Sequence, residues 1–267
     1  YAEAIAWAEE TLQLDVADFG AAHERALVLE ALGRQEEANK ARVRLGQLMR
    51  NDVHNYLNLA SDYMDSGMLD EAVELLEHIR TVHEGHVYPI VHYALAYAYE
   101  KLGRKEEAGV QLQMGQQASP DYCFPNSLFE MQLLEYIITV NPADSKAHYY
   151  LGNLYYDKKR AEDAIRHWEQ SVALDDRFPT AHRNLALAYY NKRHDAAAAQ
   201  RSLEQAFQCN KTDARVLYEL DQLHKKLGMP AQERITNLAQ HMPLVEQRDD
   251  LYLEYVALLN TLGQHEE

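Results

Sequence analysis

The sequence predicts an all-α protein, a superhelical solenoid of antiparallel helix pairs with about 15 helices in 267 residues. Three observations support this prediction. Short Leu-Gly or Ser-Gly steps end segments of helical apolar spacing, and most neighbouring steps lie about 34 residues apart. A new helix start with acidic residues in its first turn follows such a step, for example after Gly67. The composition, with 47% hydrophobic and 25% charged residues, is that of a folded globular chain and excludes extended disorder.

The glycines of these steps set the length of the repeating unit. A glycine after a helix adopts the left-handed C-cap conformation without the strain that other residues meet there. In the long interval between Gly103 and Gly228, Lys159 and Arg193 stand where the glycine is expected. The unit is therefore a helical hairpin of about 34 residues. The glycines that mark it are Gly33, Gly67, Gly103, Gly228 and Gly263.

The clearest copy of the unit spans residues 145–178. In its first helix Leu151 and Tyr155 lie on one apolar stripe. Gly152 in that helix and Ala164 in the next are small, and we expect the two helices to approach closely there. The apolar stripe and the small residues together predict interlocking helices.

This pattern of small and large residues resembles the signature of the tetratricopeptide repeat (TPR) family. The resemblance covers nearly the whole chain and implies a right-handed superhelix whose first helices line a concave groove. Asp221 and Glu233 replace small residues of the signature and Arg42 replaces a large one, so we expect these repeats to be splayed or locally polar inside. The matching positions are Leu151, Gly152, Tyr155, Ala164, Trp168 and Ser171; Leu59, Ala60, Tyr63 and Ala72; and Leu95, Ala96, Tyr99 and Ala108.

The repeats fall into two stretches. The N-terminal stretch, 1–118, holds a half repeat and three whole ones, at 1–18, 19–52, 53–88 and 89–118. The C-terminal stretch, 145–267, holds three repeats and a half repeat, at 145–178, 179–213, 214–248 and 249–267, and the second of these has a one-residue insertion.

The segment 119–144 breaks the period and predicts an irregular junction. Two prolines disfavour helix at the residues before them. The apolar spacing of residues 128–138 then predicts a lone helix that ends at Asn141. We expect residues 121–125 to form an extended, aromatic-rich plug, and the junction to bend the array.

Both ends of the sequence fall inside a hairpin. Residues 1–15 match the second helix of a repeat, and residues 264–267 stand where another second helix is due. We therefore expect an excised fragment of a longer protein. The junction and the segment after it also resemble the C-terminal repeat arm of certain large bacterial proteins, in which the arm follows a β-rich domain of uncharacterised function related to carbohydrate-active proteins. This second resemblance implies that the chemistry of such a protein lies upstream of Tyr1.

The net charge of −16 and the pI near 5.2 make nucleic acid an unsuitable partner, because phosphate binding needs a dense basic footprint. No apolar run is long enough to span a membrane. The charge is uneven: residues 1–144 carry a net −14, residues 145–213 a net +2 and residues 214–267 a net −4. We expect the middle segment to prefer an anionic or neutral ligand.

The groove predicted from the TPR resemblance is rich in tyrosine, which combines a flat apolar ring, a low entropy cost and a hydroxyl group. A binding groove requires Tyr149, Tyr156, Tyr190 and Tyr218 to be exposed on one concave face. Tyr93, Tyr97, Tyr150 and Lys146 are further groove positions. The predicted ligand-binding residues are Tyr149, Asn153, Tyr156, Arg183, Asn184, Tyr190, Arg215 and Tyr218.

Some TPR proteins hold a peptide carboxylate with a clamp of Lys, Asn and Arg side chains. By resemblance, Asn153, Asn184 and Arg215 fall on three clamp positions. Tyr149 stands in place of a clamp lysine and Glu219 in place of a clamp arginine, which argues against a true clamp.

We predict no metal site, cofactor or catalytic centre. His78, His83, His86 and His92 cluster around one loop, but the spacing of His83-Glu84-Gly85-His86 is not that of a HExxH zinc motif. Phosphate-binding loops, nucleophile elbows and paired catalytic carboxylates are not found in the sequence. The two cysteines lie far apart and have no redox spacing.

The sequence therefore predicts a non-catalytic interaction scaffold that binds a peptide or protein segment in the groove. One alternative is a structural arm that packs on a missing upstream domain or self-associates through the severed repeat ends. Another is a groove that binds a saccharide on its tyrosines. An arm would show its apolar patch on the convex face or at the ends instead.

Overall fold

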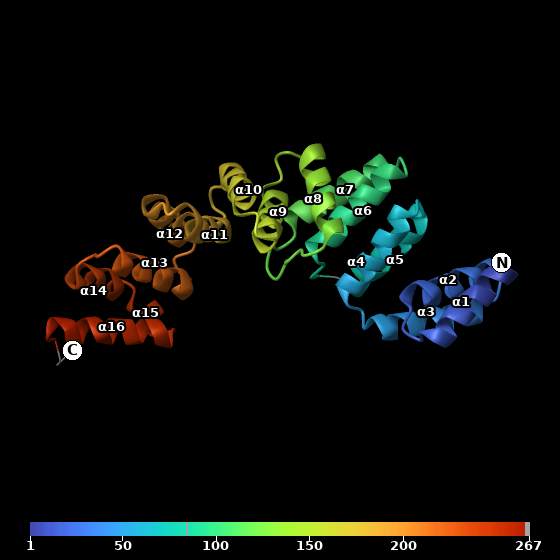
Figure 1. Cartoon of the computed structure of the whole chain (residues 1–267), viewed down its shortest axis with the longest axis horizontal. Helices are drawn as coiled ribbons and strands as arrows, with labels where there is room; N and C mark the ends of the chain where they lie inside the picture. The colour runs from blue at the N-terminus through green and yellow to red at the C-terminus, as the bar shows by residue number, and fades with distance from the viewer. Residues whose placement is uncertain (84, 265–267) are drawn as a thin grey trace. The chain divides into compact units, whose positions relative to one another are not determined.

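A computed structural model describes residues 1–83 and 85–264. Over that part of the chain there are sixteen α-helices, one π-helical segment and no strand, which confirms the predicted all-α repeat architecture. The chain forms two compact units, residues 1–123 and residues 124–267 (Figure 1). The predicted repeat boundaries are not tested by this division and stay predictions.

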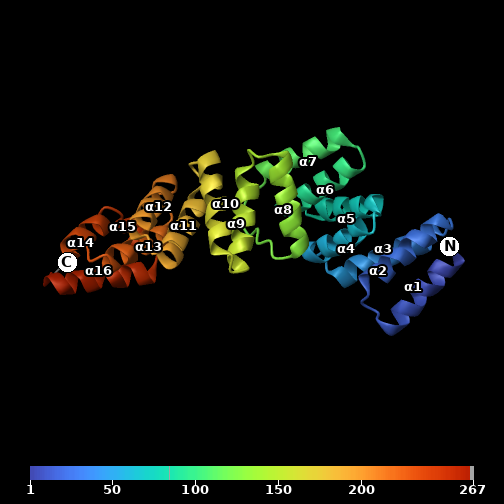
Figure 2. The same cartoon turned by 45° about the horizontal axis from the view of Figure 1, so that its top comes forward.

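The first unit consists of consecutive helical hairpins (Figure 2). Within it α2 packs on α3, α4 on α5, and α6 on α7. The helices are α1 (Ala2–Leu14), α2 (Phe19–Ala31), α3 (Gln35–Met49), α4 (Val53–Asp65), α5 (Leu69–Val82), α6 (Pro89–Lys101) and α7 (Lys105–Gln117).

The second unit repeats the same arrangement, with α9 packed on α10 and α11 on α12. Its last hairpin is less regular, because the second helix ends at Ala239 and a short separate helix follows, with Pro243 in its first turn. The helices are α8 (Leu128–Val140), α9 (Ser145–Asp157), α10 (Ala161–Leu174), α11 (Pro179–Ala188), η1 (Tyr189–Arg193), α12 (Ala196–Cys209), α13 (Ala214–Lys226), α14 (Ala231–Ala239), α15 (Met242–Val245) and α16 (Asp249–Leu262).

Local capping explains where many of these helices begin. Aspartate side chains accept hydrogen bonds from the free backbone N–H groups of the first turn. Ser127 and Glu130 form a full capping box at the start of α8. The capping aspartates are Asp18, Asp52, Asp144, Asp195 and Asp213.

The left-handed turn after the first helix of a repeat is present even where glycine is absent. Lys159 has φ +64°, as its position predicted. The same prediction for Arg193 is wrong, because His194, with φ +55°, makes the turn instead. The one-residue insertion in this repeat is taken up by η1, a π-helical turn that moves the C-cap one residue further along.

The predicted close approach at Gly152 is confirmed. A Cβ atom at this position would lie 2.5 Å from Nε1 of Trp168. Gly115 on α7 shows a second close approach, since a Cβ atom there would lie 2.6 Å from Cε1 of Tyr93. In both places a large ring of one helix occupies the space that a side chain on the other would need.

The tyrosines at the regular core position tie consecutive repeats together. The hydroxyl of Tyr99 donates to Glu77 at 2.8 Å, and that of Tyr189 donates to Glu169 at 2.8 Å. An arginine lies over each ring, Arg104 at 4.4 Å from the Tyr99 centroid and Arg193 at 5.5 Å from that of Tyr189.

The same triad forms between Glu135, Tyr155 and Arg160. Glu135 lies on α8, which packs on α9. The predicted lone helix therefore occupies the place of the second helix of a repeat. The rest of the junction differs from the prediction: Tyr122 and Phe124 are exposed, so these rings do not form a plug.

The predicted polar interior occurs at one of the three departures from the TPR signature, Asp221, whereas Arg42 and its partners lie at the surface. Arg234 donates two hydrogen bonds to Asp221, of 3.0 and 2.6 Å, and both side chains are buried. Arg42 forms ion pairs with Glu30 and Glu74. Glu233 differs, because it is exposed and leaves its neighbour Arg234 to enter the core.

Candidate functional site

The predicted groove residues lie on α9, α11, η1 and α13 of the second unit, but not all of them are accessible. Tyr149 is only 5% exposed, and its ring centroid lies 4.6 Å from that of Phe178. The turn before α11 thus covers Tyr149, and the prediction that it is exposed is wrong. Tyr150 and Tyr93 are fully buried and are also core residues.

The two predicted asparagines are brought together. Asn184 Nδ2 donates to Asn153 Oδ1 at 2.9 Å, and Trp168 Nε1 donates to the same oxygen at 3.0 Å. Both amides are half-buried. This chain of hydrogen bonds joins α9, α10 and α11, so the asparagines act at least in part as a link between repeats.

The two predicted arginines converge on one carboxylate. Arg183 forms a bidentate pair with Glu219, with N–O distances of 2.6 and 2.5 Å. Arg215 Nε donates to Glu219 Oε1 at 3.2 Å. Both arginines are thus paired with a carboxylate of the chain itself, which supports the argument against a clamp.

The three remaining tyrosines are partly exposed, and each carries a cation over its ring. Lys192 lies 5.9 Å from the centroid of Tyr156, Lys226 lies 5.2 Å from that of Tyr190, and Arg248 lies 5.5 Å from that of Tyr218. The sequence analysis missed these cations. The 36-residue separation that the first two pairs share, one repeat plus two residues, is the signal that could have revealed them.

Tyr190 and Tyr218 also line one pocket, of about 150 Å³. Leu187 and Leu223 contribute apolar surface to it, and Lys226 lies at its border with Tyr190. This pocket, together with Tyr156, Arg183 and Arg215, is referred to below as the tyrosine groove. Tyr190 and Tyr218 line the pocket itself, and Arg183 and Arg215 reach it through Glu219.

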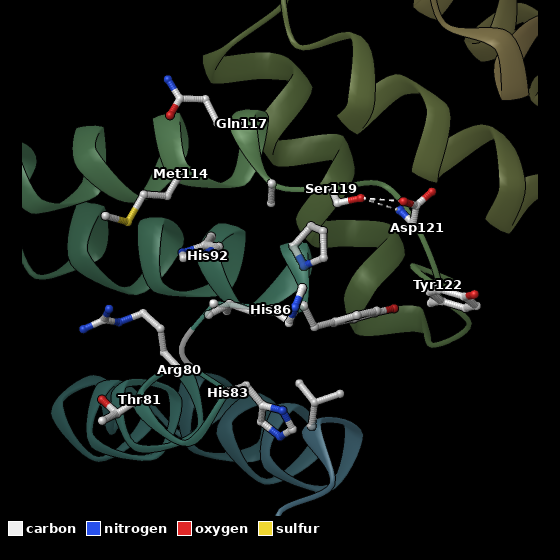
Figure 3. A pocket seen from close by; sticks show the side chains of 16 residues that line it. Arg80, Thr81, His83, His86, His92, Met114, Gln117, Ser119, Asp121 and Tyr122 are labelled. Carbon is white, nitrogen blue, oxygen red and sulfur yellow. Dashed lines mark hydrogen bonds between the residues drawn. The ribbon is translucent and has the colours of Figure 1, made fainter. Parts of the chain in front are cut away.

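The first unit contains a larger pocket, of about 1040 Å³, at the C-terminal ends of α5 and α7 (Figure 3). Its lining includes His83, His86 and His92 from the predicted histidine cluster, whereas His78 lies elsewhere. Ser119 Oγ donates to Asp121 at 2.9 Å on its rim.

Two of the three histidines of this pocket have structural partners. His83 Nε2 lies 2.9 Å from the carbonyl oxygen of Asn51, and His92 Nδ1 lies 2.7 Å from Gln111 Oε1. Burial lowers the pKa of His92. In residues 1–83 and 85–264, metal-binding groups of three or more His, Cys, Asp or Glu side chains are absent; Glu84, within the His83–His86 pattern, lies outside the described residues.

The second unit contains a pair of histidines between α9 and α10, of which His148 is buried and His167 is partly exposed. His148 and His167 approach to 3.0 Å through their Nδ1 atoms. Burial lowers the pKa of His167 to about 4, and it lowers the pKa of His148 as well. Both rings are therefore neutral at physiological pH and serve the packing of α9 on α10.

Among the described residues, each helix is too short or too polar to cross a lipid bilayer.

Stacked helical hairpins with an exposed groove define a helical-repeat scaffold. A family model for the tetratricopeptide repeat matches residues 57–122, and a second model, for the TPR repeat, matches residues 152–192. The chain thus contains tetratricopeptide repeats in both of its units. Proteins with this repeat are in general non-catalytic scaffolds for protein partners.

Solved structures of similar fold include TPR proteins. A thermophilic TPR protein of Thermus thermophilus, TTC0263, shares 19% identity over 77% of this chain and 98% of its own, with a TM-score of 0.41. MamA of Desulfovibrio magneticus RS-1 shares 17% identity over 73% of this chain and 96% of its own, with a TM-score of 0.41. YrrB, described as a TPR protein with an unusual peptide-binding site, shares 15% identity over 79% of this chain and 96% of its own, with a TM-score of 0.35. These scores are too low to match residues with a site in those proteins.

Proposed function

We propose that this chain is a non-catalytic scaffold that binds an extended segment of a partner protein in the tyrosine groove of its second unit. The pocket between Tyr190 and Tyr218 is the observation that carries the proposal. Tyr190 lies on η1, which follows α11 and positions the ring beside Lys226, and Tyr218 lies on α13, the first helix of the next repeat.

The size of this pocket favours a protein segment. At about 150 Å³ it is well below the roughly 300–1,000 Å³ that small-molecule sites occupy. A pocket of this size suits one apolar side chain of a longer ligand, and the rest of the ligand would extend along the groove.

The composition of the groove supports the same ligand. Tyrosine rings bury apolar area at low entropy cost, and the polar side chains around them can bond a peptide backbone. A saccharide would need free ring faces for stacking, but one face of each of Tyr156, Tyr190 and Tyr218 already carries a cation.

Selection from a phage-displayed library of random peptides tests the proposal. We expect enriched peptides whose binding is lost in the Tyr190→Ala/Tyr218→Ala variant. Tyr122→Ala is the matched control, since Tyr122 is 89% exposed and lines the pocket of the first unit. Failure to enrich peptides, or binding lost in Tyr122→Ala but kept in the double variant, would refute the tyrosine groove as the site.

In the alternative proposal, a self-associating arm, a different surface would form the contact between copies of the chain. Helix α1 exposes Trp7 and Leu14, which are 63% and 86% accessible. Sedimentation velocity across a concentration series, with wild type and Trp7→Ala side by side, tests this candidate. A mass that rises with concentration in wild type and not in Trp7→Ala would favour it.

A further inference from the structure

We infer that the tyrosine groove selects an acidic segment, in which carboxylates flank an apolar residue that enters the Tyr190–Tyr218 pocket. This inference rests on the proposed function and specifies its ligand.

Two lysines supply positive charge without a protein counter-charge. Lys192 and Lys226 lie over the rings of Tyr156 and Tyr190. Neither makes an ion pair with any carboxylate of the described residues, although most arginines of this unit do. A lysine held over an aromatic ring keeps its ammonium group available to a further acceptor.

The carboxylates on α9 and α13, the groove helices that have any, are paired within the chain. Glu219 accepts from both Arg183 and Arg215. Glu254 pairs with Lys225 and Arg234, and Asp157 pairs with its neighbour Lys158. The uncompensated charge of the groove is therefore positive, within a chain whose net charge is −16.

The charge and the pocket lie close enough to act on one ligand. Lys226 both lies 5.2 Å from the Tyr190 centroid and lines the pocket itself. An apolar side chain in the pocket would place a neighbouring carboxylate of the same segment within reach of this ammonium group. Lys192 is on the π-helical turn that follows α11 and offers a second contact further along the groove.

The same features disfavour nucleic acid as the anionic ligand. Binding through phosphates depends on many cations along the backbone, and here two lysines act without protein partners. An acidic peptide needs fewer cations and gains the apolar pocket.

Fluorescence anisotropy with two labelled peptides tests the inference. Both peptides contain leucine and phenylalanine at the same positions, interleaved with aspartate in one and with lysine in the other. We expect the aspartate peptide to bind about tenfold more tightly to wild type than to Lys192→Gln/Lys226→Gln, from roughly threefold for each exposed ion pair. The control, Lys105→Gln/Lys211→Gln, removes the same charge from exposed lysines outside the groove and should bind like wild type.

The outcomes separate this inference from the proposed function. Equal binding of the two peptides, or tighter binding of the lysine peptide, with loss in Tyr190→Ala would refute the acidic preference and leave the groove as a peptide site. The acidic preference is also refuted if the aspartate peptide binds Lys192→Gln/Lys226→Gln and Lys105→Gln/Lys211→Gln equally, or if it does not bind at all. The library selection decides independently whether the groove is a peptide site. A single-stranded oligonucleotide that displaces the aspartate peptide through Lys192 and Lys226 would assign the site to nucleic acid instead.

Discussion

Two glycines of α7 offer a sharp test of how closely the helices pack. A Cβ atom added at Gly115 would lie 2.6 Å from Cε1 and 2.9 Å from Cδ1 of Tyr93, whereas one added at Gly109 would meet nothing within 4 Å. Tyr93 is fully buried, so its ring cannot move aside into solvent. We therefore predict that Gly115→Ala destabilises the first unit and that Gly109→Ala stabilises it.

The magnitude follows from two opposing effects. Alanine is favoured over glycine in a helix by about 1 kcal/mol, and this gain applies to both variants. Overpacking a filled core costs about 1–3 kcal/mol, and this cost applies to Gly115→Ala alone. Because both sites lie in one helix, the helix propensity cancels in their difference, and the free energies of unfolding should differ by about 1–3 kcal/mol.

Urea unfolding, monitored by circular dichroism, measures this difference in the free energy of unfolding. Stacked repeats can unfold in stages, so hydrogen exchange of the α6 and α7 amides localises the effect. Replacing Tyr93 by leucine should remove most of the cost of Gly115→Ala if the ring is its cause. Equal stability of the two glycine variants would refute the close packing of α6 on α7.

Three further predictions concern the ties within and between repeats. Tyr189→Phe removes the hydrogen bond to Glu169 and should cost about 1–3 kcal/mol in urea unfolding, whereas Tyr252→Phe, at an exposed ring, should cost nearly nothing. Arg234→Met leaves Asp221 charged and buried and should cost about 3–5 kcal/mol; the double variant Arg234→Met/Asp221→Leu should recover most of it, and no recovery would contradict the pairing. Burial lowers the pKa of His23 from 6.5 to about 4, so the native state keeps its ring neutral. The contribution of the neutral ring to the free energy of unfolding is complete above pH 6.5 and is lost as the pH falls towards 4. The melting temperature of wild type should fall over that range by more than that of His23→Gln, and parallel curves would contradict this.

Some residues of the candidate site could be predicted from the sequence, and others could not. Tyr156 and Tyr190 follow from the repeat register because they lie 34 residues apart, and Tyr218 follows from it because it lies 35 residues after Arg183. Tyr149 satisfied the same rule and is nevertheless buried, because Phe178, which precedes the next repeat, covers it. Register predicts the direction of a side chain on its own helix, and the neighbouring repeat decides whether that direction leads to solvent.

Charge partners show the same limit. Arg183 and Arg215 look like ligand-binding cations in the sequence, but both bind Glu219. The sequence does not mark Lys192 and Lys226 as ligand-binding cations. In the structure they are the groove cations that remain available to a ligand. Ion pairs form between side chains that are 36 residues apart, as Arg183 and Glu219 are, and no local pattern predicts them.

The sequence by itself determined the all-α class, the repeat, the lone helix α8 and the close approach at Gly152. These properties depend on caps, apolar spacing and residue size within one hairpin, so they act over short stretches of chain. Only the tertiary structure decided which tyrosines form the groove, which cations stay unpaired, and that η1 moves the turn from Arg193 to His194. Those features depend on how consecutive repeats pack, where a ring or a carboxylate from the next hairpin either covers a side chain or leaves it exposed.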